Sequence, residues 1–122
     1  MRIVIAVAAA LLLAGCQGSQ SGAPSGPAPS ASQRQDVQIT LSEFKFQPAI
    51  VEVQAGPVRF HFNNTGAVEH TMLIPELSKG TPMIKPGTDF DLDLDLPAGT
   101  YHVVCDVPGH KEAGMEMTLV VK

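Results

Sequence analysis

The chain has few charges, few aromatic residues and few cysteines. Charged residues make up only 16% of its 122 positions, which excludes a highly charged, disordered chain. With 8 basic against 12 acidic side chains it lacks the basic face that phosphate groups require, so we expect no nucleic-acid partner. Aromatic residues reach 5% and tryptophan is absent, but the apolar fraction of 44% is ordinary for a globular protein. The length leaves room for one domain.

A basic and apolar segment opens the chain. Arg2 precedes an apolar run, residues 3–14, that is too short to span a bilayer as a mature helix. The run ends in Leu13-Ala14-Gly15-Cys16, which resembles the lipobox of bacterial lipoproteins. We therefore expect residues 1–15 to be a signal peptide and Cys16 to be lipidated, the alternative being an ordinary signal peptide with an incidental cysteine. Several acyl chains would tether the protein to a membrane of the bacterial cell envelope, facing the periplasm or the exterior.

The next segment, residues 16–35, has the composition of a linker. After Cys16 it consists of Gly, Ser, Pro, Ala and Gln with Arg34 as its only charge, and it contains no Val, Ile, Leu or Phe. Nothing there can bury a core, so we expect a flexible connection. The folded domain is expected over residues 36–122.

Apolar and polar residues alternate throughout that domain, which is the pattern of half-buried strands. The clearest example is residues 89–96, where four aspartates alternate with one phenylalanine and three leucines. The other expected strand segments are residues 37–41, 44–46, 50–53, 58–63, 67–74, 101–105 and 115–121. Seven or eight short strands separated by turn signals predict an all-β protein, an antiparallel β-sandwich. Residues 75–88, with three prolines, leave room for a turn of helix.

The aspartates at positions 89, 91, 93 and 95 have three interpretations. We expect a solvated strand face opposite a leucine core face, because charges that alternate with apolar residues are typical of one. A docking surface and a calcium site are the alternatives.

A cysteine, a histidine and a methionine stand near the C-terminus with four residues in each gap: Cys105, His110 and Met115. Soft sulfur donors favour copper(I), whereas imidazole suits both oxidation states, so this set with a second histidine matches a blue-copper site. Cys105 and Met115 are expected at two strand ends joined by one loop with His110 in its middle. The second histidine is His70, in the expected strand 67–74.

The remaining candidates are expected to be structural. A lone thiol outside the cytoplasm is a liability unless something occupies it, which favours a metal ligand over an inert buried Cys105. His61 and His102 are expected to face solvent, because each alternates with apolar neighbours. Met117 is expected in the core, although it is a conceivable replacement for Met115.

The stretch from Gly99 through Cys105, His110 and Met115 to Val121 resembles the cupredoxins, the small blue-copper proteins of the plastocyanin and azurin type. The resemblance covers roughly residues 36–122 and implies a Greek-key β-sandwich with one type 1 copper. Carried over by position, His70, Cys105 and His110 are the equatorial ligands and Met115 is the axial one. The chain departs from azurins and plastocyanins after the first histidine, where they usually have Asn and it has Thr71.

The resemblance also implies a function. Cupredoxins carry single electrons, so we expect a membrane-tethered, monomeric electron carrier rather than an enzyme, with redox partners such as a cytochrome or an oxidase. Electrons would pass at the edge of His110, within a patch formed by Pro108, Gly109, Ala113 and Gly114. The alternatives are a copper-binding lipoprotein for copper delivery or storage, and a metal-free β-sandwich binding module.

Overall fold

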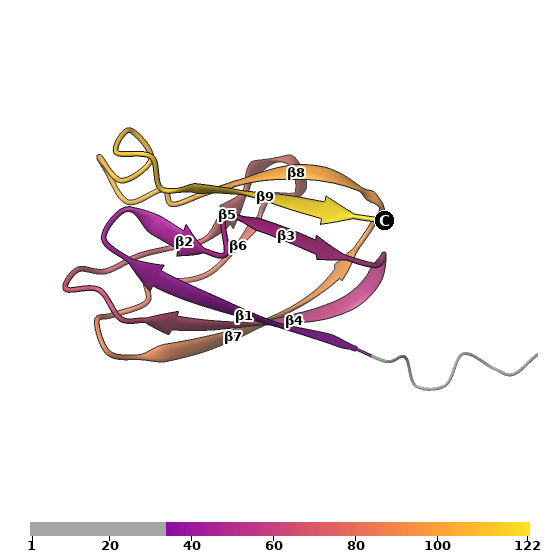
Figure 1. The fold of residues 1–122 in the computed structure, drawn as a ribbon, viewed down its shortest axis with the longest axis horizontal. Coiled ribbons are helices and arrows are strands. Elements are labelled where there is room, and N and C mark those ends of the chain that lie inside the picture. The colour runs from indigo at the N-terminus through magenta and orange to yellow at the C-terminus, as the bar shows by residue number, and fades with distance from the viewer. Residues whose placement is uncertain (1–33) are drawn as a thin grey trace, which may run out of the picture.

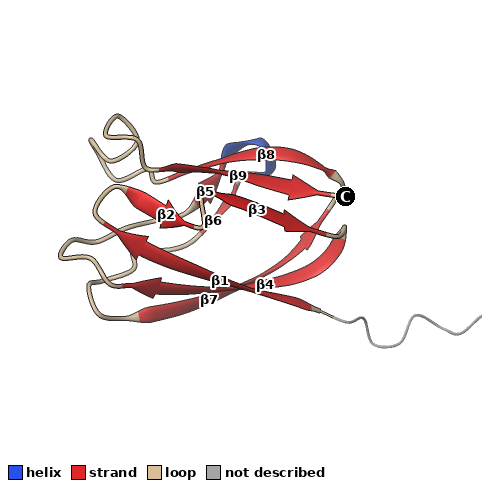
Figure 2. Ribbon diagram, viewed as in Figure 1, coloured by secondary structure: helices blue, strands red, loops and turns tan. Residues whose placement is uncertain are grey.

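The alternating segments form two β-sheets that face each other in the computed structural model, which describes residues 34–122 (Figures 1 and 2). The first sheet has the strand order β2-β1-β4-β7, with bounds Gln35–Ser42 (β1), Lys45–Gln47 (β2), Gly56–Asn64 (β4) and Asp89–Leu96 (β7). The second has the order β3-β9-β8-β5-β6, with bounds Ile50–Val53 (β3), Leu73–Ile74 (β5), Lys79–Gly80 (β6), Gly99–Val104 (β8) and Glu116–Val121 (β9). One short 3-10 helix, η1 (Pro75–Leu77), lies in the segment expected to hold a helical turn. The predicted β-sandwich is confirmed.

Period-two alternation sets the core, because successive strand residues point to opposite faces of a sheet. In β4, Val58, Phe60 and Phe62 are at most 1% exposed, and the two phenylalanine rings stack with centroids 6.0 Å apart. Leu119 on β9 and Val103 on β8 enter the same core from the opposite sheet. The hydrophobic layer between the sheets therefore follows the sequence pattern directly.

Both sheets are mixed rather than purely antiparallel. β4–β7 and β8–β9 are antiparallel, as expected, but β1 runs parallel to β4 and β3 runs parallel to β9. The chain changes sheet between β2 and β3, so β4 returns beside β1 in the same direction instead of closing a hairpin with it. Periodicity reports which face of a strand is buried, and it carries no information on strand direction.

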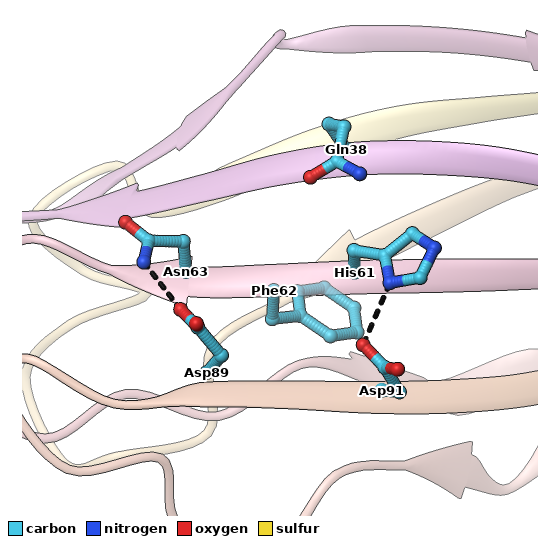
Figure 3. Close-up of a pocket in the computed structure, with 6 residues that line it drawn as sticks. All are labelled: Gln38, His61, Phe62, Asn63, Asp89 and Asp91. Carbon is cyan, nitrogen blue, oxygen red and sulfur yellow. Dashed lines mark hydrogen bonds and ion pairs between the residues drawn. The ribbon is translucent and has the colours of Figure 1, made fainter.

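The aspartates of β7 form cross-strand pairs on the outer face of the first sheet. The register places Asp89, Asp91 and Asp93 opposite polar residues of β4, and Figure 3 shows two of these pairs. Arg59 Nε and Nη2 donate to both carboxylate oxygens of Asp93 at 2.6 and 2.5 Å, and His61 Nδ1 lies 2.7 Å from Asp91. This face is the expected solvated one. His61 pairs with Asp91 there, and it is not part of the metal-binding group found among residues 34–122.

The expected strand 67–74 is mostly wrong. Only Leu73–Ile74 (β5) is a strand, and His70 instead forms an isolated bridge to Ile84, with backbone N···O distances of 3.1 and 2.8 Å. Side chains replace the sheet ladder here, because Asn64 Nδ2 donates to the carbonyls of Val68 and Ile84 at 2.9 Å each. The segment is therefore an ordered loop rather than a regular strand.

Four connections gather at the end of the sandwich opposite the C-terminus (Figure 1). They are the β1–β2 turn, the β4–β5 loop, the β6–β7 loop and the β8–β9 loop. Loops held by a rigid sandwich are a common place for functional side chains. Within residues 34–122 no helix has the length and apolar character needed to cross a membrane. The expected signal peptide, Cys16 and most of the linker lie outside the described residues.

Candidate metal centre

Three of the expected ligands meet at this end of the molecule. The donor atoms of His70, Cys105 and His110 all lie within 4.8 Å of one another. His110 Nδ1 is 3.2 Å from His70 Nδ1 and 3.5 Å from Cys105 Sγ. All three residues are buried, at 8% exposure or less. A thiol and two imidazoles that converge inside a core fit copper, for which this donor set with a weak axial methionine is diagnostic.

The β8–β9 loop brings the two sulfur residues and His110 together through its own backbone. Cys105 N donates to Met115 O at 3.1 Å, and Met115 N donates to His110 O at 3.0 Å. Gly109 and Gly114 have φ angles of +85° and +96°, a backbone conformation that residues with a Cβ rarely adopt. Met115 is fully buried and its backbone is hydrogen-bonded to Cys105 and His110, and its role as the fourth ligand stays a prediction.

The loop after β4 holds His70 in place. Besides the bridge to Ile84, the fully buried amide of Asn64 ties this loop to the segment before β7. Buried polar groups that are fully hydrogen-bonded make a local structure rigid. The imidazole of His70 is thus fixed from a loop, not from the strand that the sequence indicated.

Thr71 links the two ligand segments. Its N–H donates to Cys105 Sγ at 3.4 Å, and its hydroxyl oxygen lies 3.6 Å from the same sulfur. The hydroxyl also donates to the carboxylate of Asp106 and accepts the N–H of Asp106 at 3.0 Å. Thr71 therefore places a donor at the sulfur and holds the residue after the cysteine.

Burial and charge both act on His70. Burial, followed by the nearby His110, lowers the pKa of His70, and the Glu43 carboxylate opposes that shift in part. Neutral imidazole is the form that binds a metal, so the lowered pKa keeps His70 able to bind a metal at more acidic pH.

Phe44 contacts the His110 ring, and the sequence pattern did not predict this. It was expected to be part of a strand, but it lies in the β1–β2 turn with φ +55°, and it is 40% exposed. Its ring meets the His110 ring edge-on, with centroids 5.1 Å apart and an interplanar angle of 88°. One signal was available, because Leu41 and Phe44 are three residues apart and this odd step breaks the period-two alternation.

The other expected residues fall into two groups. His102 is exposed, lies 3.2 Å from Glu116 and is not part of the cluster, and Met117 is buried in the core as expected. The residues expected around the electron-transfer edge are all exposed, namely Pro108, Gly109, Ala113 and Gly114. His110 itself is only 8% exposed, because Phe44 packs against its ring.

The family model described as "Cupredoxin-like domain" matches residues 3–121, so the chain belongs to this family. The copper-resistant cuproprotein CopI of Rubrivivax gelatinosus is 26% identical over 132 residues, covering 89% of this chain and 80% of CopI. Among solved structures, auracyanin from Roseiflexus castenholzii has a TM-score of 0.66 at 20% identity over 72% of this chain and 97% of its own. Auracyanin A from Chloroflexus aurantiacus, described as a "blue" copper protein, has a TM-score of 0.60 at 24% identity over 71% and 99%.

The structural likenesses establish the fold, and the family match agrees with it. Together with the arrangement of His70, Cys105, His110 and Met115, they identify a blue copper protein with one type 1 copper.

Proposed function

We propose that this protein is an electron carrier tethered to a bacterial membrane. The observation that carries the proposal is the buried convergence of His70, Cys105 and His110, with Met115 beside Cys105 on the same loop. In this proposal the first three are the equatorial ligands and Met115 is the weak axial ligand. Copper bound there takes up one electron and releases it again. The chain contributes fixed ligands in a site that excludes water, which keeps rearrangement during the cycle small.

Electrons are proposed to enter and leave at the loop end of the sandwich. His110 is the ligand nearest the exposed rim formed by Pro108, Gly109, Ala113 and Gly114. Phe44 covers the His110 ring and is itself 40% exposed, so a redox partner such as a cytochrome or an oxidase meets that ring together with the rim. Enzymatic turnover at a second metal lacks support. The two histidines outside the site, His61 and His102, pair with carboxylates and not with each other.

Copper delivery or storage is the second candidate. The observation in its favour is the 26% identity to a protein described as a copper-resistant cuproprotein. The two functions differ in what moves. An electron carrier exchanges electrons rapidly between its oxidised and reduced forms and keeps its metal, whereas a copper-delivery protein passes copper quickly to an acceptor protein.

Two rates measured on one copper-loaded preparation separate these functions. We expect fast electron self-exchange, measured by NMR line broadening in mixtures of the two forms, and slow transfer of copper to an apo-acceptor. Fast copper transfer with slow self-exchange would assign the protein to copper delivery.

The membrane tether rests on Leu13-Ala14-Gly15-Cys16 alone, which lies outside the described residues. Full-length protein made in bacteria is expected in the detergent phase of a phase-partition experiment. Cys16→Ser is expected to release it or to leave it unprocessed. Recovery of unmodified wild type from the aqueous phase would remove the lipid anchor and leave the copper site unaffected.

A further inference from the structure

One ring nitrogen of His70 has no hydrogen-bond partner among the described residues. His70 is fully buried, and Nε2 has no hydrogen-bond partner among residues 34–122. The other ring nitrogen, Nδ1, is the one that faces His110. When Nδ1 binds a metal, Nε2 carries the ring proton, and a metal-bound histidine almost always donates that proton to an outer acceptor. A buried N–H without an acceptor is costly, so the surroundings of Nε2 indicate which group receives it.

Gly66 leaves open the space that Nε2 faces. A methyl group on its Cα would lie 3.1 Å from His70 Nε2, 3.2 Å from Glu43 Oε1 and 3.2 Å from Asn64 Oδ1. The imidazole nitrogen and the carboxylate therefore both border one small volume. Only glycine keeps that volume free.

Glu43 is the stronger of the two acceptors at this point. Asn64 Oδ1 already accepts the N–H of Gly66 at 2.9 Å, and the other end of that amide donates to two carbonyls. Glu43 Oε1 accepts the N–H of Ala67 at 2.5 Å, which anchors the β1–β2 turn to the loop that carries His70. A carboxylate has further lone pairs, and hydrogen bonds to an ionised acceptor are about twice as strong as neutral ones.

We propose that Glu43 is the outer partner of His70. Its carboxylate receives the Nε2–H of the metal-bound imidazole across the space at Gly66, directly or through one water, and its negative charge favours copper(II) over copper(I). This inference rests on the proposed copper site. It makes Glu43 a positioning residue, and it places both histidines under one turn, since the adjacent Phe44 packs on His110.

Glu43→Gln in the full chain tests the proposal. Glutamine keeps the length of the side chain and can still accept the N–H of Ala67, but it removes the charge. We expect a higher reduction potential than in the wild type, and a copper(II) affinity about tenfold lower, the smaller end of the usual effect of losing such a partner. Glu52→Gln is the control for net charge, because Glu52 pairs with Lys122 at 2.5 Å on β3 and is not in the cluster.

A second readout reports the hydrogen bond itself. In the diamagnetic copper(I) protein, the Nε2–H of His70 is expected as a slowly exchanging proton signal, and Glu43→Gln is expected to speed its exchange with water. Gly66→Ala places a methyl group against Nε2 and is expected to lower copper(II) affinity while Glu43 is still present.

The outcomes separate this inference from the proposed function. If Glu43→Gln shifts the potential no more than Glu52→Gln does, and the His70 proton exchanges as in the wild type, Glu43 is not the partner, although the copper site stands. If the wild type forms no thiolate–copper chromophore, both proposals fail.

Discussion

At the scale of single residues, Thr71 shows how one side chain can serve two ligand segments. Its N–H points at the Cys105 sulfur while its hydroxyl holds Asp106, so the segment that leads into β5 and the segment that follows β8 are fixed to each other. Hydrogen bonds to a ligand sulfur and to its neighbours tune a metal site as well as holding it.

Thr71→Val removes the hydroxyl and keeps the N–H that points at the sulfur. The N–H of Asp106 then loses its acceptor, so we expect the free energy of unfolding to fall by about 1–2 kcal/mol. The copper(II) protein is expected to keep its colour, because Cys105 is unchanged. Urea unfolding and the visible spectrum measure the two effects. Thr100→Val, at an exposed position on β8, is the control, and equal losses in both variants would contradict the link to Asp106.

Phe44→Ala tests the cover over His110. Removing the ring opens the imidazole to solvent, because the edge-on contact at 5.1 Å is lost. We expect a chelator to extract copper several-fold faster than from the wild type, measured by the decay of the visible band. Ile50→Ala removes another exposed apolar side chain, from β3, and should leave the rate unchanged. An unchanged rate in Phe44→Ala would mean that the ring does not protect the site.

At the scale of elements, the β8–β9 loop was predictable and the β4–β5 loop was not. The first carries its ligands at short, regular spacing between two alternating strands, so local pattern places Cys105, His110 and Met115 together. The second is organised by the side chain of Asn64, whose partners lie up to 20 residues away along the chain. Periodicity cannot report such contacts, which is why residues 67–74 read as a strand and the β1–β2 turn was not connected with the site.

Asn64→Ala tests what holds the His70 loop. The carbonyls of Val68 and Ile84 would both lose a buried or partly buried donor, so we expect the free energy of unfolding to fall by about 2 kcal/mol or more. Copper(II) affinity is expected to fall as well, because His70 loses its fixed position. Asn63→Ala, the exposed neighbour on β4, is the control. Chemical unfolding and a competition titration give the two quantities; a copper affinity equal to that of the control would place the support for His70 elsewhere.

At the scale of the whole molecule, the two sheets turn a sequence pattern into a fixed metal site. Alternation predicts the strands and the buried layer, and the sandwich follows because two apolar faces must cover each other. It does not predict strand order, and the parallel pairing of β1 with β4 is what brings the β1–β2 turn and the β4–β5 loop to the same end. Of the site, the sequence predicted His70, Cys105, His110 and Met115 as ligands, whereas the positions of Glu43, Phe44 and Gly66 beside them come from contacts between distant turns.

The visible spectrum of the purified protein loaded with copper(II) tests the central claim most directly. A cysteine thiolate bound to copper(II) in a site with two histidines gives an intense charge-transfer band, so the wild type is expected to be strongly coloured. Cys105→Ser is expected to abolish the band. A colourless copper-loaded wild type, or a serine variant that keeps the colour, would contradict the blue-copper assignment.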